Sequence, residues 1–171
     1  AENGGITLNG AITTDGVVTL DGPITLATGA ITITTADDAI NLQGTVDGGQ
    51  ALTLSSGSAA VTVDGAIGSS TALTSLTVNS SGAGTIEIAD IGTSSAAGVS
   101  GATAIGNTST GTLTLDGTVY TTTGTQTYTA ATGGGNIDIT NTAGTTFTTT
   151  NTAVAFNTSG VDLANNATTT I

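Results

Sequence analysis

A short pattern of alternating apolar residues returns at a nearly constant spacing along the whole 171-residue chain. Each copy has an apolar residue, any residue and a second apolar residue, and most copies continue with a small or polar residue and a glycine, as in VTLDG from Val18. The full copies begin at Val18, Ile40, Val61, Ile86, Leu113, Ile137 and Val161, and a partial copy begins at Ile6. Successive full copies start 21 to 27 residues apart, and a period of this length indicates a repeat architecture.

Second short apolar segments lie between these copies, and they also alternate. They are 31–33, 52–54, 76–78, 126–128 and 154–156. A period of two puts the apolar side chains on one face of an extended strand and the intervening Thr or Ala on the other. Threonine makes up roughly a quarter of the chain, and its branched Cβ favours the extended conformation over helix. The sequence therefore predicts an all-β fold built from very short strands.

Two all-β architectures use short alternating strands, the antiparallel sandwich and the parallel β-solenoid (β-helix). Two or three short strands and glycine-rich corners in each repeat of roughly 24 residues fit one solenoid coil, which stacks on the previous coil at ~4.8 Å. We therefore expect a single-stranded parallel β-solenoid, one domain over residues 1–171, with about seven to eight coils and a length of about 35 to 40 Å. Residues 92–111 interrupt the regular spacing of the repeat and are expected to form an irregular or looped-out corner.

Three segments carry a resemblance to a known family. They are GAITTDGVVTLDGPITL (10–26), TALTSLTVNSSGAGTIEI (71–88) and GTLTLDGTVYTTTGTQTYTA (111–130). These segments resemble the repeat region of filamentous-haemagglutinin-like giant bacterial surface exoproteins. The resemblance implies a right-handed parallel β-helix, secretion to the cell surface or the extracellular space, and a role in extracellular fibres or adhesion.

The charge composition excludes several classes of function. The chain has 12 Asp and Glu residues and no Lys, Arg or His, so its net charge is −12. With no cation to neutralise phosphate, we expect no nucleic-acid partner, and no apolar run is long enough for membrane insertion. A Ser or Thr nucleophile would lack its usual activating base, so we expect no enzymatic activity. Carbohydrate binding or carboxylate-based carbohydrate cleavage is the weakest alternative.

Two carboxylates are candidate metal ligands. If the copies align, their second position reads Thr19, Asn41, Thr62, Glu87, Thr114, Asp138 and Asp162. Asp138 and Asp162 would then lie one coil apart, at ~4.8 Å, where two like charges in water repel by ~0.9 kcal/mol. A calcium ion shared with Asn141 or Asn165 would relieve this repulsion, because hard cations bind clustered oxygens. Calcium is the only cofactor that the sequence leaves open.

Outward threonine rows support an alternative function. Thr32 with Thr34, and Thr112 with Thr114, have the Thr-x-Thr spacing that ice-binding β-solenoids present as a flat ladder. Polar and acidic residues interrupt these rows in other copies. Ice binding is therefore the alternative to a structural role.

Neither end of the repeat array shows a capping segment in the sequence. Solenoid ends are sheet edges that associate with other strands unless they are capped. We therefore expect assembly through Ile6 and Leu8 at one end and Val161, Leu163 and Ile171 at the other. The partners would be further copies, head to tail, or flanking repeats of a longer parent chain. The expected function is that of a structural subunit or segment of a secreted extracellular fibre or cell-surface adhesin.

Overall fold

The computed structural model describes residues 4–163 and 169–171, and the regular structure of these residues is entirely β. Every strand pair in it is parallel, and partners lie about one repeat apart in the sequence, as in Val18↔Ile40 and Ile40↔Val61. The strands form three faces, which we call sheets I, II and III.

Sheets I and II have seven strands each and run the length of the molecule. Sheet I consists of β2 (Ile12–Thr14), β5 (Ile31–Thr35), β8 (Ala51–Ser55), β10 (Ser75–Asn79), β12 (Thr103–Ile105), β15 (Gln126–Thr129) and β18 (Val154–Asn157). Sheet II consists of β3 (Val18–Leu20), β6 (Ile40–Leu42), β9 (Val61–Val63), β11 (Ile86–Ile88), β13 (Leu113–Leu115), β16 (Ile137–Ile139) and β19 (Val161–Leu163).

Sheet III is formed by shorter strands in two groups of three. The first group is β1 (Ile6–Leu8), β4 (Ile24–Leu26) and β7 (Val46–Asp47), and the second is β14 (Val119–Thr121), β17 (Thr145–Thr148) and β20 (Thr169–Thr170). Single-residue bridges join the two groups through Val46, Ile67, Ile91 and Tyr120. The third face is therefore continuous, although its middle coils contribute only one paired residue each.

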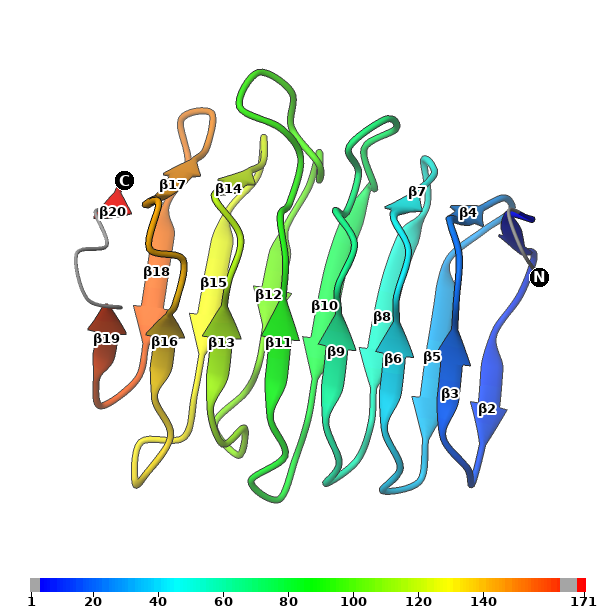
Figure 1. Cartoon of the computed structure of the whole chain (residues 1–171), viewed down its shortest axis with the longest axis horizontal. Helices are drawn as coiled ribbons and strands as arrows, with labels where there is room; N and C mark the ends of the chain where they lie inside the picture. Colours follow the sequence, from blue (N-terminus) through cyan, green and yellow to red (C-terminus); the bar gives the residue numbers. More distant parts are fainter. Residues whose placement is uncertain (1–3, 164–168) are drawn as a thin grey trace.

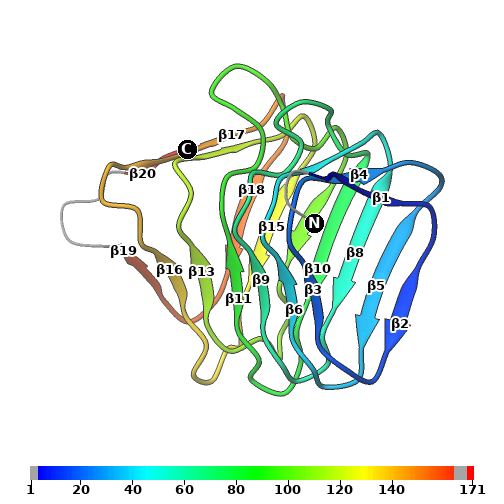
Figure 2. The same cartoon turned by 45° about the vertical axis from the view of Figure 1, so that its right-hand side comes forward.

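The chain winds as a right-handed solenoid. In Figure 1 the strands of sheet II run upward on the near side, those of sheet I run downward on the far side, and the chain advances from the N-terminus at the right to the C-terminus at the left. Sheet III crosses the top, and Figure 2 shows the three faces enclosing one interior. The fold is a parallel β-solenoid of about six turns, with about 24 residues per turn.

The number of turns is smaller than the expected seven to eight, because seven strands in a sheet define only six steps. At ~4.8 Å per step the strands span about 29 Å, shorter than the expected 35 to 40 Å. The partial copy at Ile6 is also placed differently from the full copies. Ile6 pairs with Ile24 in sheet III, whereas the full copies form sheet II. The same short motif therefore serves two faces.

The register of sheet II follows the alignment of the seven copies. The first apolar position forms one inward column from Val18 to Val161, and the second forms another from Leu20 to Leu163. Away from the two ends, the side chains in these columns are buried from solvent, with Ile137 at 0% and Ile139 at 1% exposure. One continuous hydrophobic core therefore runs along the axis, because each inward residue packs on its equivalents in neighbouring coils.

Glycine is required at the corner between sheets II and III because successive coils nearly touch there. A Cβ on Gly44 would lie 2.1 Å from the carbonyl oxygen of Gly22, and one on Gly65 would lie 2.2 Å from that of Gly44. Neither Gly44 nor Gly65 has a φ in the left-handed region. Close backbone approach, rather than a positive φ, therefore explains these two glycines.

The segment 92–111, expected to be an irregular corner, contains both a loop and a regular strand. The loop after β11 includes a turn in which the Thr93 N–H donates to the Ala96 carbonyl at 2.8 Å, and it rises above the neighbouring corners in Figure 1. The chain then returns to sheet I as β12, with Thr103 and Ile105 buried.

Candidate functional site: the two ends of the solenoid

The C-terminal end exposes apolar side chains that continue the buried columns. Val161 and Leu163 of β19 are 41% and 51% exposed, whereas their equivalents one coil earlier are buried. Ile171, which follows β20, is 74% exposed. These side chains belong to the core by position and are exposed because no described residue stacks above them. The three residues predicted for assembly at this end therefore lie on an open apolar surface.

The N-terminal end presents the opposite edges of the same three sheets, β1, β2 and β3. Ile6 is half-buried, and Leu8 is buried at 8% exposure because β4 packs along it. The two predicted residues therefore lie on the edge strand of sheet III, but they expose less apolar surface than the residues at the other end.

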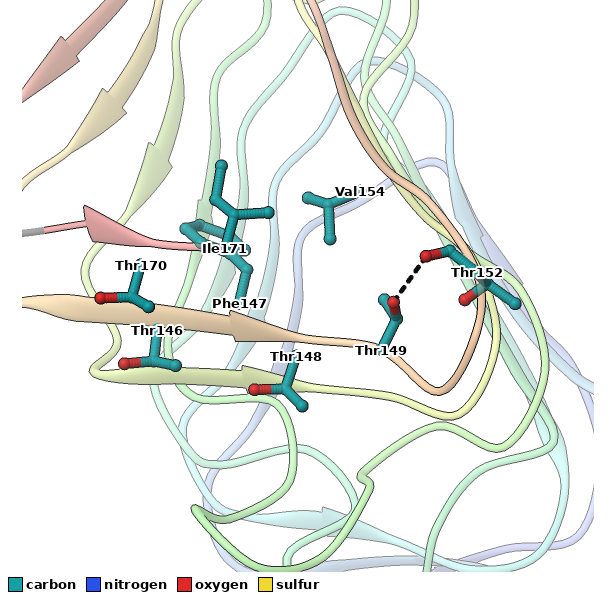
Figure 3. Close-up of a pocket in the computed structure, with 8 residues that line it drawn as sticks. All are labelled: Thr146, Phe147, Thr148, Thr149, Thr152, Val154, Thr170 and Ile171. Atoms are coloured by element: carbon teal, nitrogen blue, oxygen red, sulfur yellow. Dashed lines mark hydrogen bonds between the residues drawn. The ribbon is translucent and has the colours of Figure 1, made fainter.

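A hollow of about 410 Å³ opens at the C-terminal end, where sheets III and I meet. It is lined by Thr146, Phe147, Thr148, Thr149, Thr152, Val154, Thr170 and Ile171. Figure 3 shows Phe147, Val154 and Ile171 around an open space, with the Thr149 hydroxyl turned away to donate to the Thr152 carbonyl at 2.7 Å. The lining combines apolar side chains with neutral hydroxyls and includes no Asp or Glu side chain.

Four aromatic side chains fill the core below this hollow. Tyr120 stacks on Phe147 with ring centroids 5.0 Å apart, and Tyr128 stacks on Phe156 at 5.3 Å. The two stacks meet edge to face, with Tyr128 and Phe147 at 5.5 Å. Each stack joins residues paired in neighbouring coils, so the aromatics act as core fillers.

The tyrosine hydroxyls are held by a buried polar network. Tyr128 donates to Oε1 of Gln126 at 2.8 Å, and Nε2 of Gln126 donates to the carbonyl oxygens of Tyr120 at 2.8 Å and Thr148 at 2.9 Å. The Tyr120 hydroxyl donates to the Ile88 carbonyl at 2.8 Å. Burial raises the pKa of both tyrosines well above the usual value. This network positions the last coils and leaves no free group for chemistry.

Asp138 and Asp162 are direct neighbours in sheet II, as the alignment predicted. Burial raises the pKa of Asp138 above its usual value, and the adjacent Asp162 carboxylate raises it further. Oδ1 of Asp138 is shielded from solvent and has no hydrogen-bond partner among the described residues. Asn136 donates from Nδ2 to Oδ2 of Asp162 at 3.0 Å. Ionisation of Asp138 therefore opposes folding at neutral pH.

The predicted calcium site is not assembled beyond this pair. The described residues contain no cluster of three or more His, Cys, Asp or Glu side chains that could hold a metal. Asn165 lies outside the described residues. Asn141 is engaged elsewhere, because Nδ2 donates to the Asp116 carbonyl at 2.8 Å and Oδ1 accepts from the Ala143 N–H at 2.9 Å. Calcium takes about six to eight oxygens, so its binding here stays a prediction.

Other aspartates fasten successive coils together, a role that no sequence pattern predicted. Oδ1 of Asp47 accepts from the N–H groups of Ser70 and Thr71 at 2.7 and 2.9 Å. Oδ1 of Asp90 accepts from the N–H of Thr118 at 2.6 Å and of Val119 at 3.0 Å. In each case the donor lies 23 to 29 residues later, one coil on. Some of the acidic residues therefore stabilise the stacking of neighbouring coils.

The threonine rows are only partly regular. On sheet I, Thr32, Thr53 and Thr77 stack on three successive coils, but the next partners in the row are Ala104, Thr127 and Ala155. On sheet II, Thr114 lies between Glu87 and Asp138. The longest uninterrupted row is therefore three coils of sheet I.

Comparisons with known proteins do not assign this chain to a family. No protein-family model, curated protein or solved structure matches the chain. In the part of the chain that the structure describes, no helix has the length and apolar character needed to cross a membrane. The function must therefore be inferred from the solenoid and its surfaces.

Proposed function

We propose that the chain is a rigid structural segment of an extracellular fibre or cell-surface adhesin, in which further coils stack on both ends of the solenoid. The observation that carries this proposal is the open apolar edge at the C-terminal end, where Val161 and Leu163 are 41% and 51% exposed. Unpaired strand edges bind further strands readily, and all three sheets end in such an edge at both ends of the described structure.

The two ends are chemically complementary. Val18 and Leu20 of β3 occupy the same two inward columns as Val161 and Leu163 of β19. A copy stacked head to tail would place valine on valine and leucine on leucine. It would also place Thr19 next to Asp162 in the outward column, so no third carboxylate joins the Asp138–Asp162 pair. In this column the joint therefore continues the core without placing two carboxylates side by side.

The energetics allow two versions of this assembly. Covering the exposed half of Val161 and Leu163 contributes about 1 kcal/mol for each side chain. Association of separate molecules costs at least about 4 kcal/mol in lost translational and rotational freedom, so backbone pairing along all three edges would have to supply the rest. Flanking repeats of a longer parent chain would avoid this cost. The partner is thus a second copy or a covalently continuous repeat.

The mechanism proposed for this role is mechanical. Backbone hydrogen bonds between coils and a continuous side-chain ladder stiffen the rod along its axis. The absence of Lys and Arg removes the cleavage sites of trypsin-like proteases. Both properties suit a protein that works outside a cell.

Sedimentation velocity over a range of concentrations tests the self-assembling version. The wild-type chain should form species that grow with concentration. Leu163→Lys should shift them to the monomer, because it places a charge on the open apolar edge. Thr114→Lys is the matched control, since it adds the same charge in the outward column away from both ends. A wild-type chain that stays at 16.2 kDa at every concentration would contradict self-assembly.

Ice binding is the second candidate, supported by the Thr32–Thr53–Thr77 stack on sheet I. A capped monomer with a regular threonine face would show thermal hysteresis. If the wild-type chain shows hysteresis and Thr53→Val or Thr77→Val reduces it, this candidate replaces the fibre proposal.

A further inference from the structure

The carboxylates are distributed unevenly over the three faces. None of the residues in the seven strands of sheet I is acidic. Sheet II carries Glu87, Asp138 and Asp162 in its strands, and Asp47 lies in sheet III. The other described acids lie at corners: Asp15, Asp37 and Asp38 between sheets I and II, and Asp21, Asp64, Asp90 and Asp116 after the strands of sheet II.

The outer side of sheet I, which we call the neutral face, is thus the only long face without charge among the described residues. Its outward residues are Thr13, Thr32, Thr34, Ala51, Thr53, Ser55, Ser75, Thr77, Asn79, Ala104, Thr127, Thr129, Ala155 and Asn157. They are aligned in register over seven coils. Sheet I lies on the opposite side of the solenoid from the acidic sheet II (Figure 1).

We infer that the neutral face is the lateral contact surface between two copies of this chain. This inference rests on the proposed fibre and names the face through which neighbouring solenoids pack. Because each chain carries a charge of −12 and no cation, a contact through any charged face brings like charges together. Only sheet I allows close approach over a long face without burying a carboxylate.

Contact through sheet I keeps the carboxylates of the two copies far apart. With sheets about 10 Å apart, face-to-face contact through sheet I keeps the sheet II carboxylates of the two copies about 30 Å apart. This is more than three Debye lengths at physiological salt, where one is about 8 Å, so their repulsion is screened. Contact through sheet II would instead bring Glu87 of both copies together, well within one Debye length, where the two carboxylates repel each other.

The area explains when this contact would form. Seven strands at ~4.8 Å, averaging about four residues of ~3.3 Å, give about 450 Å² per copy and about 900 Å² for the pair. Stable protein interfaces bury about 1,200 to 2,000 Å² in total, so one pair of single solenoids falls below this range and would associate only weakly. The area adds along a fibre, since every stacked copy contributes the same face. Lateral pairing should therefore strengthen with fibre length.

The chain offers a direct test because it contains no cysteine. β10 is the central strand of sheet I, and Thr77 is its central outward residue. A closed two-fold contact with full overlap places Thr77 opposite Thr77 of the second copy. Glu87 holds the equivalent central position on β11 of sheet II. Thr77→Cys and Glu87→Cys are therefore matched variants, and the second removes a charge and so favours contact through the control face.

Under mild oxidation with diamide, Thr77→Cys should accumulate a disulfide-linked dimer on a non-reducing gel, while Glu87→Cys should remain monomeric. Equal dimer yields for both variants, or no dimer from Thr77→Cys, would overturn the inference. Binding of the wild-type chain to insoluble polysaccharide together with no Thr77→Cys dimer would assign the neutral face to carbohydrate instead. That result would also overturn the self-contact.

A second comparison separates this inference from the fibre proposal. Thr77→Cys combined with Leu163→Lys should still form the disulfide dimer, because the lateral contact does not use the ends. If the wild-type chain never polymerises in sedimentation but Thr77→Cys still dimerises, the fibre proposal fails and the lateral contact stands. Single, unpaired filaments without a Thr77→Cys dimer would instead support the fibre proposal and overturn the lateral contact.

Discussion

Replacing Gly44 with alanine should destabilise the solenoid at a defined corner. The new Cβ would lie 2.1 Å from the Gly22 carbonyl oxygen, where ordinary contact begins near 3.4 Å, so the two coils must separate locally by about 1.3 Å. Backbone hydrogen bonds fix the coils on both sides of this point. Gln43 N–H donates to the Leu20 carbonyl at 3.0 Å, and Ile24 N–H donates to the Thr45 carbonyl at 2.7 Å.

The expected cost follows from these two bonds. Each contributes about 0.5 to 1.5 kcal/mol net, so straining both lowers the free energy of unfolding by about 1 to 3 kcal/mol. Overpacking a well-packed site costs a similar amount, about 1 to 3 kcal/mol. Gly10→Ala is the control, because a Cβ there meets no atom within 4 Å. It should change stability by less than about 0.5 kcal/mol.

Urea unfolding followed by far-ultraviolet circular dichroism measures both variants. The midpoint should fall for Gly44→Ala with an unchanged slope, and it should stay near the wild-type value for Gly10→Ala. If Gly44→Ala were as stable as Gly10→Ala, the coils could not approach at this corner as described, and the stacking register between Gly22 and Gly44 would be wrong.

Three further predictions concern ionisable groups. Asp138→Asn should raise the melting temperature at neutral pH, because burial and Asp162 raise the Asp138 pKa and the folded state disfavours its ionised form. This increase in melting temperature should shrink as pH falls and Asp138 takes up its proton. An increase that stays constant from pH 3 to 7 would refute this cause. Tyr120 and Tyr128 should not ionise near the usual pKa of about 10 while the chain is folded. A rise in phenolate absorbance near pH 10 without loss of the circular dichroism signal would contradict their burial. If calcium binds at Asp138 and Asp162, it should raise the melting temperature of the wild type but not of Asp162→Asn, and no change in the wild type removes the calcium hypothesis.

Much of the fold could be predicted because one residue pattern decides it. In sheet II the apolar positions from Val18 to Val161 align by sequence alone, and the same alignment correctly placed Asp138 beside Asp162. A slip of one residue would turn an apolar face to solvent, so the pattern specifies the register strongly. The five alternating segments between the copies likewise became strands of sheet I.

Sheet III and parts of the middle coils could not be predicted from the sequence pattern. Ile67 and Ile91 each provide only one paired residue on that face, and a single apolar residue has no periodicity to recognise. β12 was also missed, since the first of its two inward residues is Thr103 rather than an aliphatic residue. The aspartate bonds between coils depend on backbone N–H groups more than 20 residues away, which no local pattern reveals.

The residues predicted for assembly differ in their exposure. Val161, Leu163 and Ile171 are exposed as a solenoid edge requires, but Leu8 is buried by its own neighbour β4. The hollow beside Phe147 could not be foreseen, because it depends on how wide the last coils become around the aromatic stacks.

Negative-stain electron microscopy of the wild-type chain at neutral pH, with and without EDTA, shows whether the solenoid assembles through its ends. Long, unbranched filaments, single or in pairs, are expected in both conditions, since strand pairing and apolar stacking at the ends need no metal. Loss of filaments in EDTA would make a bound cation part of the joint. Discrete particles no longer than one solenoid, about 29 Å, in both conditions would contradict assembly of this chain through its ends.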